Sequence, residues 1–67
     1  MKISKQQIEL LMAMQNLSAG QLAERSGISR QNISTIKTRG TCTTTTAAKL
    51  AKGLGCSVEK FTIIEEV

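Results

Sequence analysis

The feature that most constrains this chain is a pair of helical segments joined by almost no connecting residues. Residues 18–38 read as a short helix, a turn at Ser26-Gly27-Ile28, and a second helix that begins at Ser29. Glycine readily takes the left-handed conformation that ends a helix, and serine accepts hydrogen bonds from the free amides at a helix start. So short a connection fixes the two helices at a steep angle, which leaves the second helix protruding from the domain.

Serine caps and apolar periodicity place the remaining helices. Ser4 with Gln7, and Ser18 with Gln21, fit the capping box, in which the serine hydroxyl and the glutamine side chain each accept a backbone amide. The pattern predicts five helices, which run from Ser4 to about Gln15, from Ser18 to Ser26, from Ser29 to about Thr38, from the threonine tract 41–46 to Leu54, and from Ser57 to about Phe61.

The length of 67 residues leaves room for one domain, 1–67, with one small core at about 4–61. Phe61 is the only aromatic residue, so aliphatic side chains must fill that core, with Met12 and Met14 as filler. We therefore expect an all-α, compact five-helix bundle. The tail 62–67 contains the β-branched run Thr62-Ile63-Ile64 and fits either a fraying end or a short strand.

Charge is unevenly distributed along the chain. The net charge is +4, yet no acidic residue lies between Arg25 and Val58. Such a basic block attracts polyanions, because each neutralised phosphate releases condensed counterions. By charge alone, a solvated basic face is an equally good interpretation. The cations of the block are Arg25, Arg30, Lys37, Arg39, Lys49 and Lys52.

The third helix divides into an apolar side and a polar side. With Ile33 and Ile36 facing inward, and about 100° of rotation per residue, four uncharged polar residues point away from the core. Arg30 and Lys37 flank them. A protruding helix of this kind fits the major groove of B-DNA, with neutral hydrogen-bonding groups for bases and cations beside phosphates. The four outward residues are Gln31, Ser34, Thr35 and Thr38.

Other classes of protein fit the composition poorly. The chain has no His, Asp or Tyr, which removes the usual general bases, and we expect no catalytic residues and no cofactor. Cys42 and Cys56, without histidine, cannot complete the four-ligand shell of a structural zinc, so we expect free thiols and no metal. With no secretory leader and no apolar run of the about 20 residues that cross a bilayer, we expect a cytoplasmic protein without a membrane role.

Two segments carry a resemblance to a known family. They read LAERSGISRQNISTI at 22–36 and KLAKGLGCS at 49–57. In sequence and separation they resemble the lambda-repressor-like helix-turn-helix family, which includes phage repressors, Cro-type proteins and small bacterial regulators. The resemblance covers roughly 4–61. It implies a five-helix bundle whose third helix enters the major groove of double-stranded DNA.

The resemblance also implies roles for individual residues. Base contacts fall to Ser29, Arg30, Gln31 and Thr35. Contacts to the DNA backbone fall to Ser18 at the start of the second helix, and to Thr38, Arg39 and Thr41 at the end of the third. We also expect Ser34 and Lys37 to contact the backbone.

Two positions depart from the family pattern. Ala19 stands where many relatives have a phosphate-binding glutamine, so only its backbone amide can serve. Met12 and Lys37 align with a buried Arg–Glu pair of some relatives. Since that pair is absent, we expect Lys37 to be free for DNA.

The implied function is that of a small transcriptional repressor of the phage or mobile-element type. A single recognition helix is too small to specify a site alone, so we expect a homodimer on a palindromic operator. The fifth helix and the tail 62–67, with Ile63 and Ile64, are the expected dimer surface. The alternative is an antitoxin that binds a protein toxin as well as DNA.

Overall fold

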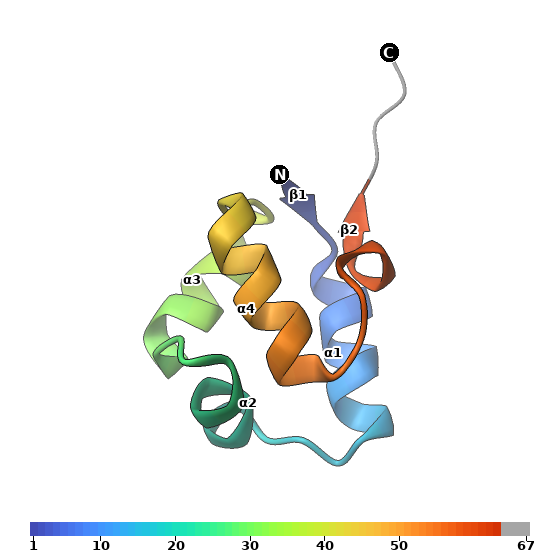
Figure 1. Ribbon diagram of the computed structural model, residues 1–67, viewed down its shortest axis with the longest axis vertical. Coiled ribbons are helices and arrows are strands. Elements are labelled where there is room, and N and C mark those ends of the chain that lie inside the picture. The colour runs from blue at the N-terminus through green and yellow to red at the C-terminus, as the bar shows by residue number, and fades with distance from the viewer. Residues whose placement is uncertain (64–67) are drawn as a thin grey trace.

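The structure, a computed structural model that describes residues 1–63, contains four α-helices packed around one core (Figure 1). The helices are α1 (Lys5–Met14), α2 (Ala19–Ser26), α3 (Arg30–Arg39) and α4 (Thr44–Leu54). One turn of 3-10 helix, η1 (Val58–Lys60), and two short strands, β1 (Lys2–Ile3) and β2 (Thr62–Ile63), complete the described chain.

The predicted fifth α-helix is wrong, and the fold is not purely helical. η1 makes a single turn, and Ser57 provides no side-chain hydrogen bond to its start. The chain then becomes extended at Thr62 and Ile63, where β-branched side chains favour a strand. β2 pairs antiparallel with β1, so the open choice between a fraying end and a strand resolves to a strand at these two residues. Ile64 and the rest of the tail lie outside the described residues.

The predicted helix boundaries are confirmed within a residue or two. Ser18 and Gln21 form both bonds of the capping box, at 3.1 and 2.9 Å. Ser4 accepts from the Gln7 amide at 3.2 Å, but its own amide donates to the Phe61 carbonyl at 2.7 Å, so the second bond of the predicted capping box does not form. Gly27 and Gly40 end α2 and α3 with φ of 74°, a left-handed conformation that other residues adopt only with strain.

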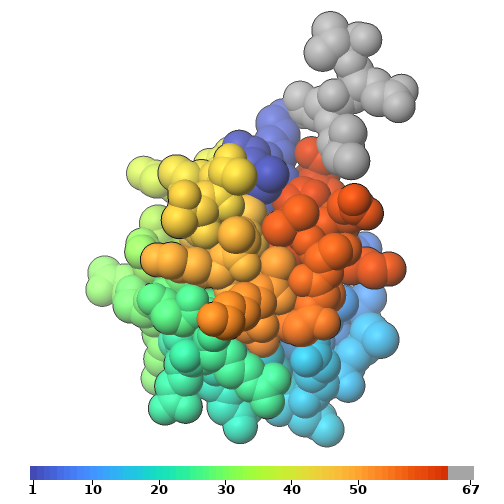
Figure 2. Space-filling model, viewed as in Figure 1, coloured from blue at the N-terminus to red at the C-terminus, as the bar shows by residue number. Residues whose placement is uncertain are grey.

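The core lies between α4 and the other helices, and α4 crosses the middle of the face seen in Figure 2. The core includes Ile3, one residue before the predicted start of the core at about residue 4. Met12 is buried as expected, but Met14 is 72% exposed, so the prediction of a core role for Met14 is wrong. Positions two residues apart on a helix differ by about 200° of rotation. Met14 therefore points away from the inner side of α1, which holds Met12 and Ile8.

Two close contacts fix the first two helices against α4. A Cβ atom added to Gly53 of α4 would lie 2.9 Å from the Cβ of Ser26, so α2 and α4 touch with almost no side chain between them. The Gln15 side chain donates a hydrogen bond of 2.7 Å to the Leu54 carbonyl at the end of α4. These contacts hold α2, and with it the turn into α3, in a defined position.

Candidate nucleic-acid interface

The turn between α2 and α3 is anchored at both of its ends. Ile28 is buried, and its amide donates to the Ser26 hydroxyl at 3.3 Å. Ser29 then caps α3 by accepting from the Asn32 amide at 3.2 Å. One apolar anchor and one cap therefore set where α3 starts, and α3 lies along one side of the molecule (Figure 1).

α3 has the two sides that its sequence predicts. Ile33 and Ile36 are 2% and 8% exposed, and they attach the helix to the core. The four outward polar residues, Gln31, Ser34, Thr35 and Thr38, are all exposed, as are Ser29 and Arg30. The Thr35 hydroxyl donates to the Gln31 carbonyl at 2.9 Å, which leaves the lone pairs of its oxygen available as acceptors.

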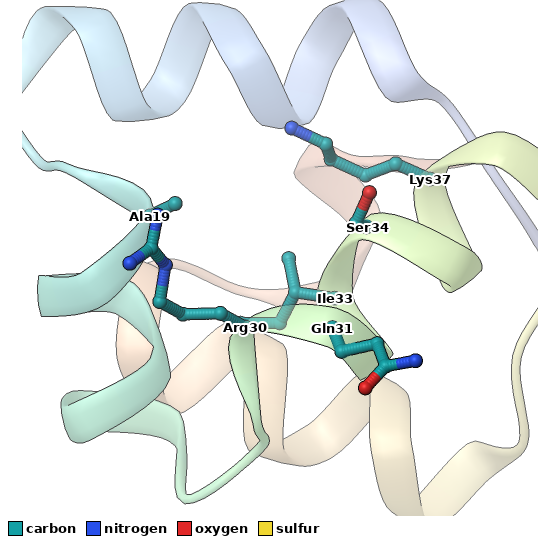
Figure 3. Close-up of a pocket in the computed structure, with 6 residues that line it drawn as sticks. All are labelled: Ala19, Arg30, Gln31, Ile33, Ser34 and Lys37. Atoms are coloured by element: carbon teal, nitrogen blue, oxygen red, sulfur yellow. The ribbon is translucent and has the colours of Figure 1, made fainter.

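A pocket of about 470 Å³ lies between the start of α2 and the outer side of α3 (Figure 3). The Arg30 side chain extends toward Ala19, the Lys37 ammonium extends toward α1, and the Gln31 amide points away from both. The lining residues are Ala19, Arg30, Gln31, Ile33, Ser34 and Lys37. Two cations and a hydroxyl thus surround a concave surface next to a helix start.

The start of α2 adds hydrogen-bond donors to this pocket. The amides of Ala19 and Gly20 have no acceptor among the described residues, as is normal for the first turn of a helix. The Ser18 amide already donates to Gln21, but the Ser18 hydroxyl accepts its bond and keeps its own proton free to donate. A Cβ on Gly20 would lie 4.0 Å from Cδ of Arg30, so the guanidinium stem passes directly over the helix start. Free amides, the helix dipole and a cation together favour an anion such as a phosphate.

The remaining predicted backbone contacts lie at the C-terminal end of α3. Thr38 and Arg39 are exposed in the last turn, and Thr41 is exposed just beyond it. A bridge between Lys2 and Thr41 ties this loop to β1. Thr38 and Arg39 directly follow Lys37, which lines the pocket, so these residues extend the same surface toward the C-terminal end of α3.

Lys37 is not free, and the expectation that it would be is wrong. Its Nζ lies 3.6 Å from Oε1 of Glu9 on α1, and the side chains are 19% and 51% exposed, respectively. In the Arg–Glu pair expected from the family resemblance, Met12 takes the place of the base and Lys37 that of the acid. In this structure Lys37 supplies the base, and the acid is Glu9, one turn before Met12 on α1. The sequence gives a reason to expect the pair with Glu9. Glu9 lies three residues before Met12, and residues three apart on a helix are neighbours on its surface. The contact of Lys37 with the DNA backbone stays a prediction.

Neither of the two cysteines lines the pocket. Among residues 1–63 no group of three His, Cys, Asp or Glu side chains is placed to hold a metal ion. Cys42 and Cys56 are free thiols. Burial raises the pKa of both, against a smaller opposing effect of the N-terminal ammonium on Cys42 and of Lys60 on Cys56. Both side chains are half-buried.

None of the described helices is long and apolar enough to cross a membrane. This follows from their lengths, since the longest, α4, has 11 residues.

Comparison with known proteins agrees with this geometry. Residues 7–65 match the family model of the Cro/C1-type HTH DNA-binding domain. Searches of curated proteins and of solved structures returned no match. The matched region contains the whole of α2, the turn, α3 and α4, and most of α1. The chain therefore belongs to the Cro/C1-type helix-turn-helix family, whose domains bind double-stranded DNA and regulate transcription.

Proposed function

We propose that this protein is a sequence-specific repressor that reads the major groove with α3. The observation that carries the proposal is the exposed polar start of α3, backed on the opposite side by the buried Ile33 and Ile36. Each base pair presents a distinct pattern of donors, acceptors and methyl groups in the major groove, and polar side chains read that pattern. A repressor needs only to occupy its operator, so DNA binding alone is enough for repression.

The contacts divide between bases and backbone. Ser29, Arg30, Gln31 and Thr35 lie on the first turns of α3 and are proposed to face the bases. Ser34 and Lys37 line the pocket, and Ser18 caps the adjacent start of α2, where a phosphate is proposed to meet the free amides of Ala19 and Gly20. Thr38 and Arg39 at the C-terminal end of α3, with Thr41 just beyond it, are proposed to contact the DNA backbone as well.

A homodimer on a palindromic operator follows from the size of this surface. One ten-residue helix offers base contacts from only a few side chains, so two copies on half-sites about 34 Å apart are needed for a specific site. The proposed dimer surface is the end of the chain, where Ile63 of β2 is 50% exposed. Sedimentation of the free protein and of its DNA complex tests this part, and a monomer in both would contradict it.

Selection of bound sequences from random DNA tests the central proposal. An enriched, two-fold symmetric site is expected, and no enrichment would refute sequence-specific binding. On the selected site, Gln31→Ala should relax the preference at one position in each half-site, by about 1–3 kcal/mol of discrimination. Thr45→Ala, at an exposed position on α4, is the matched control and should leave the preference unchanged.

A backbone contact should behave differently. Arg39→Ala should weaken binding to all sequences alike and reduce the salt slope by about 1. Lys60→Ala removes the same charge from η1 and should change the slope less. If Gln31→Ala and Arg39→Ala gave equal losses on specific and random DNA, the division between bases and backbone would be wrong.

The antitoxin alternative stays a prediction. Recovery of one stoichiometric small protein with the tagged chain from its source cell, with DNA binding retained, would support it.

A further inference from the structure

The ion pair between α1 and α3 involves a lysine that is proposed to contact the DNA backbone. Glu9 lies on α1, outside both segments that resemble the family, and its Oε1 is 3.6 Å from Nζ of Lys37. Lys37 also lines the pocket beside the start of α3 (Figure 3). The same ammonium therefore has an internal partner and lies where a DNA phosphate is proposed to bind.

The exposure of the two side chains indicates that this pair can be exchanged. The Glu9 side chain is 51% exposed and that of Lys37 is 19% exposed, so water reaches the carboxylate. Ion pairs open to water are weak, because solvent screens the charges and ordering the side chains costs entropy. A phosphate that approaches the pocket can thus replace Glu9 as the partner of Lys37.

We propose that Glu9 is an internal competitor of DNA, a positioning residue that holds Lys37 in the free protein and lowers backbone affinity independently of base sequence. The inference rests on the proposed function. Near the pocket, Glu9 is the acid that neutralises one of the two lining cations, Arg30 and Lys37. Since this neutralisation reduces attraction to every DNA sequence while base contacts are retained, Glu9 restrains non-specific binding.

The charges around this pair support the assignment. Arg30 extends toward Ala19 at the start of α2, whereas Lys37 extends toward α1, the helix that carries its partner Glu9 (Figure 3). Lys37 is thus the cation of the pocket whose charge is offset by an acid on α1. Replacing Glu9 with glutamine keeps the size of the side chain and removes only its charge.

The test compares Glu9→Gln with Glu59→Gln, which makes the same change of net charge on exposed η1. Affinity for the selected operator and for a random duplex is measured over a range of salt concentrations. Glu9→Gln should bind both duplexes about two- to fivefold more tightly at low salt, and the salt slope should steepen by up to about one unit. Glu59→Gln should give a smaller change.

A double-mutant cycle separates competition from general electrostatics. In a Lys37→Gln background, Glu9→Gln should no longer increase affinity, because the ammonium that it releases is gone. Unfolding by urea is measured in parallel to confirm that each variant is folded. An unchanged or weaker affinity of Glu9→Gln, or an equal gain with and without Lys37, would overturn the inference. Absence of DNA binding by the unmodified protein would instead refute the proposed function.

Discussion

The close contact between α2 and α4 makes a specific prediction about Gly53. An added Cβ would lie 2.9 Å from Cβ of Ser26, 3.0 Å from Cδ1 of Leu22 and 3.1 Å from the amide nitrogen of Ser26. Two of these three atoms are on or next to the α2 backbone, so rotation of a side chain cannot relieve the contact. Gly53→Ala must push the two helices apart.

The magnitude follows from two opposing effects. Overpacking in a core costs typically about 1–3 kcal/mol, and backbone contacts place this case near the upper limit. Alanine is favoured over glycine inside a helix by about 1 kcal/mol. We therefore expect Gly53→Ala to lower the free energy of unfolding by about 1–2 kcal/mol, which lowers the melting temperature of a domain this small by about 5–15 °C.

Gly20 provides the matched control. It also lies within a helix, but the nearest atoms to its added Cβ are 4.0 Å away, on Arg30 and Ser18. Gly20→Ala should therefore keep the gain in helix propensity without a clash and be neutral or stabilising by up to about 1 kcal/mol. Urea unfolding followed by circular dichroism measures both. A Gly53→Ala variant as stable as the unmodified protein would refute the close approach of α2 and α4.

Three further predictions concern the core, a helix end and the thiols. Ile33→Ala should lower the free energy of unfolding by about 2–5 kcal/mol, since Ile33 is 2% exposed, and an effect under about 1 kcal/mol would contradict its core role. Gln15→Ala should cost about 1–2 kcal/mol in the same assay, because the part-buried Leu54 carbonyl loses its 2.7 Å bond; an unchanged unfolding midpoint would show that water replaces that bond. Alkylation of Cys42 and Cys56 at pH 8 should be slower in the folded protein than in the urea-unfolded chain. The raised pKa of each thiol in the folded state leaves a smaller fraction of thiolate at this pH. The rates should rise as pH passes the folded pKa, and equal rates in both states would contradict the burial.

The local pattern of the sequence is enough to place α1 to α4. Serine caps act on amides two or three residues away, and glycine stops depend on the conformation of one residue. The apolar period similarly identifies Ile33 and Ile36 as the inner side of α3. The exposed start of α3 follows from that assignment, so the location of the candidate interface is readable from sequence.

Local sequence patterns do not predict the structure where the chain has similar propensities for helix and for extended structure. Ser57 and Val58 read as a helix start, but the chain makes one turn and then extends. The extension is stabilised by pairing with β1, which lies before the predicted start of the core at about residue 4. Ile3 is buried there at 3% exposure, because residues at opposite ends of the chain meet in one sheet.

The sequence by itself therefore determined α1 to α4, their ends and the polar side of α3, because hydrogen bonds and side-chain contacts within a helix join residues about one turn apart. Only the tertiary structure decided the β1–β2 pair, the contact of Ser26 with Gly53, and the partner of Lys37. Each of these joins segments far apart in the chain. Which side chains meet there depends on how the helices pack, and that packing is set by the whole core rather than by any short pattern.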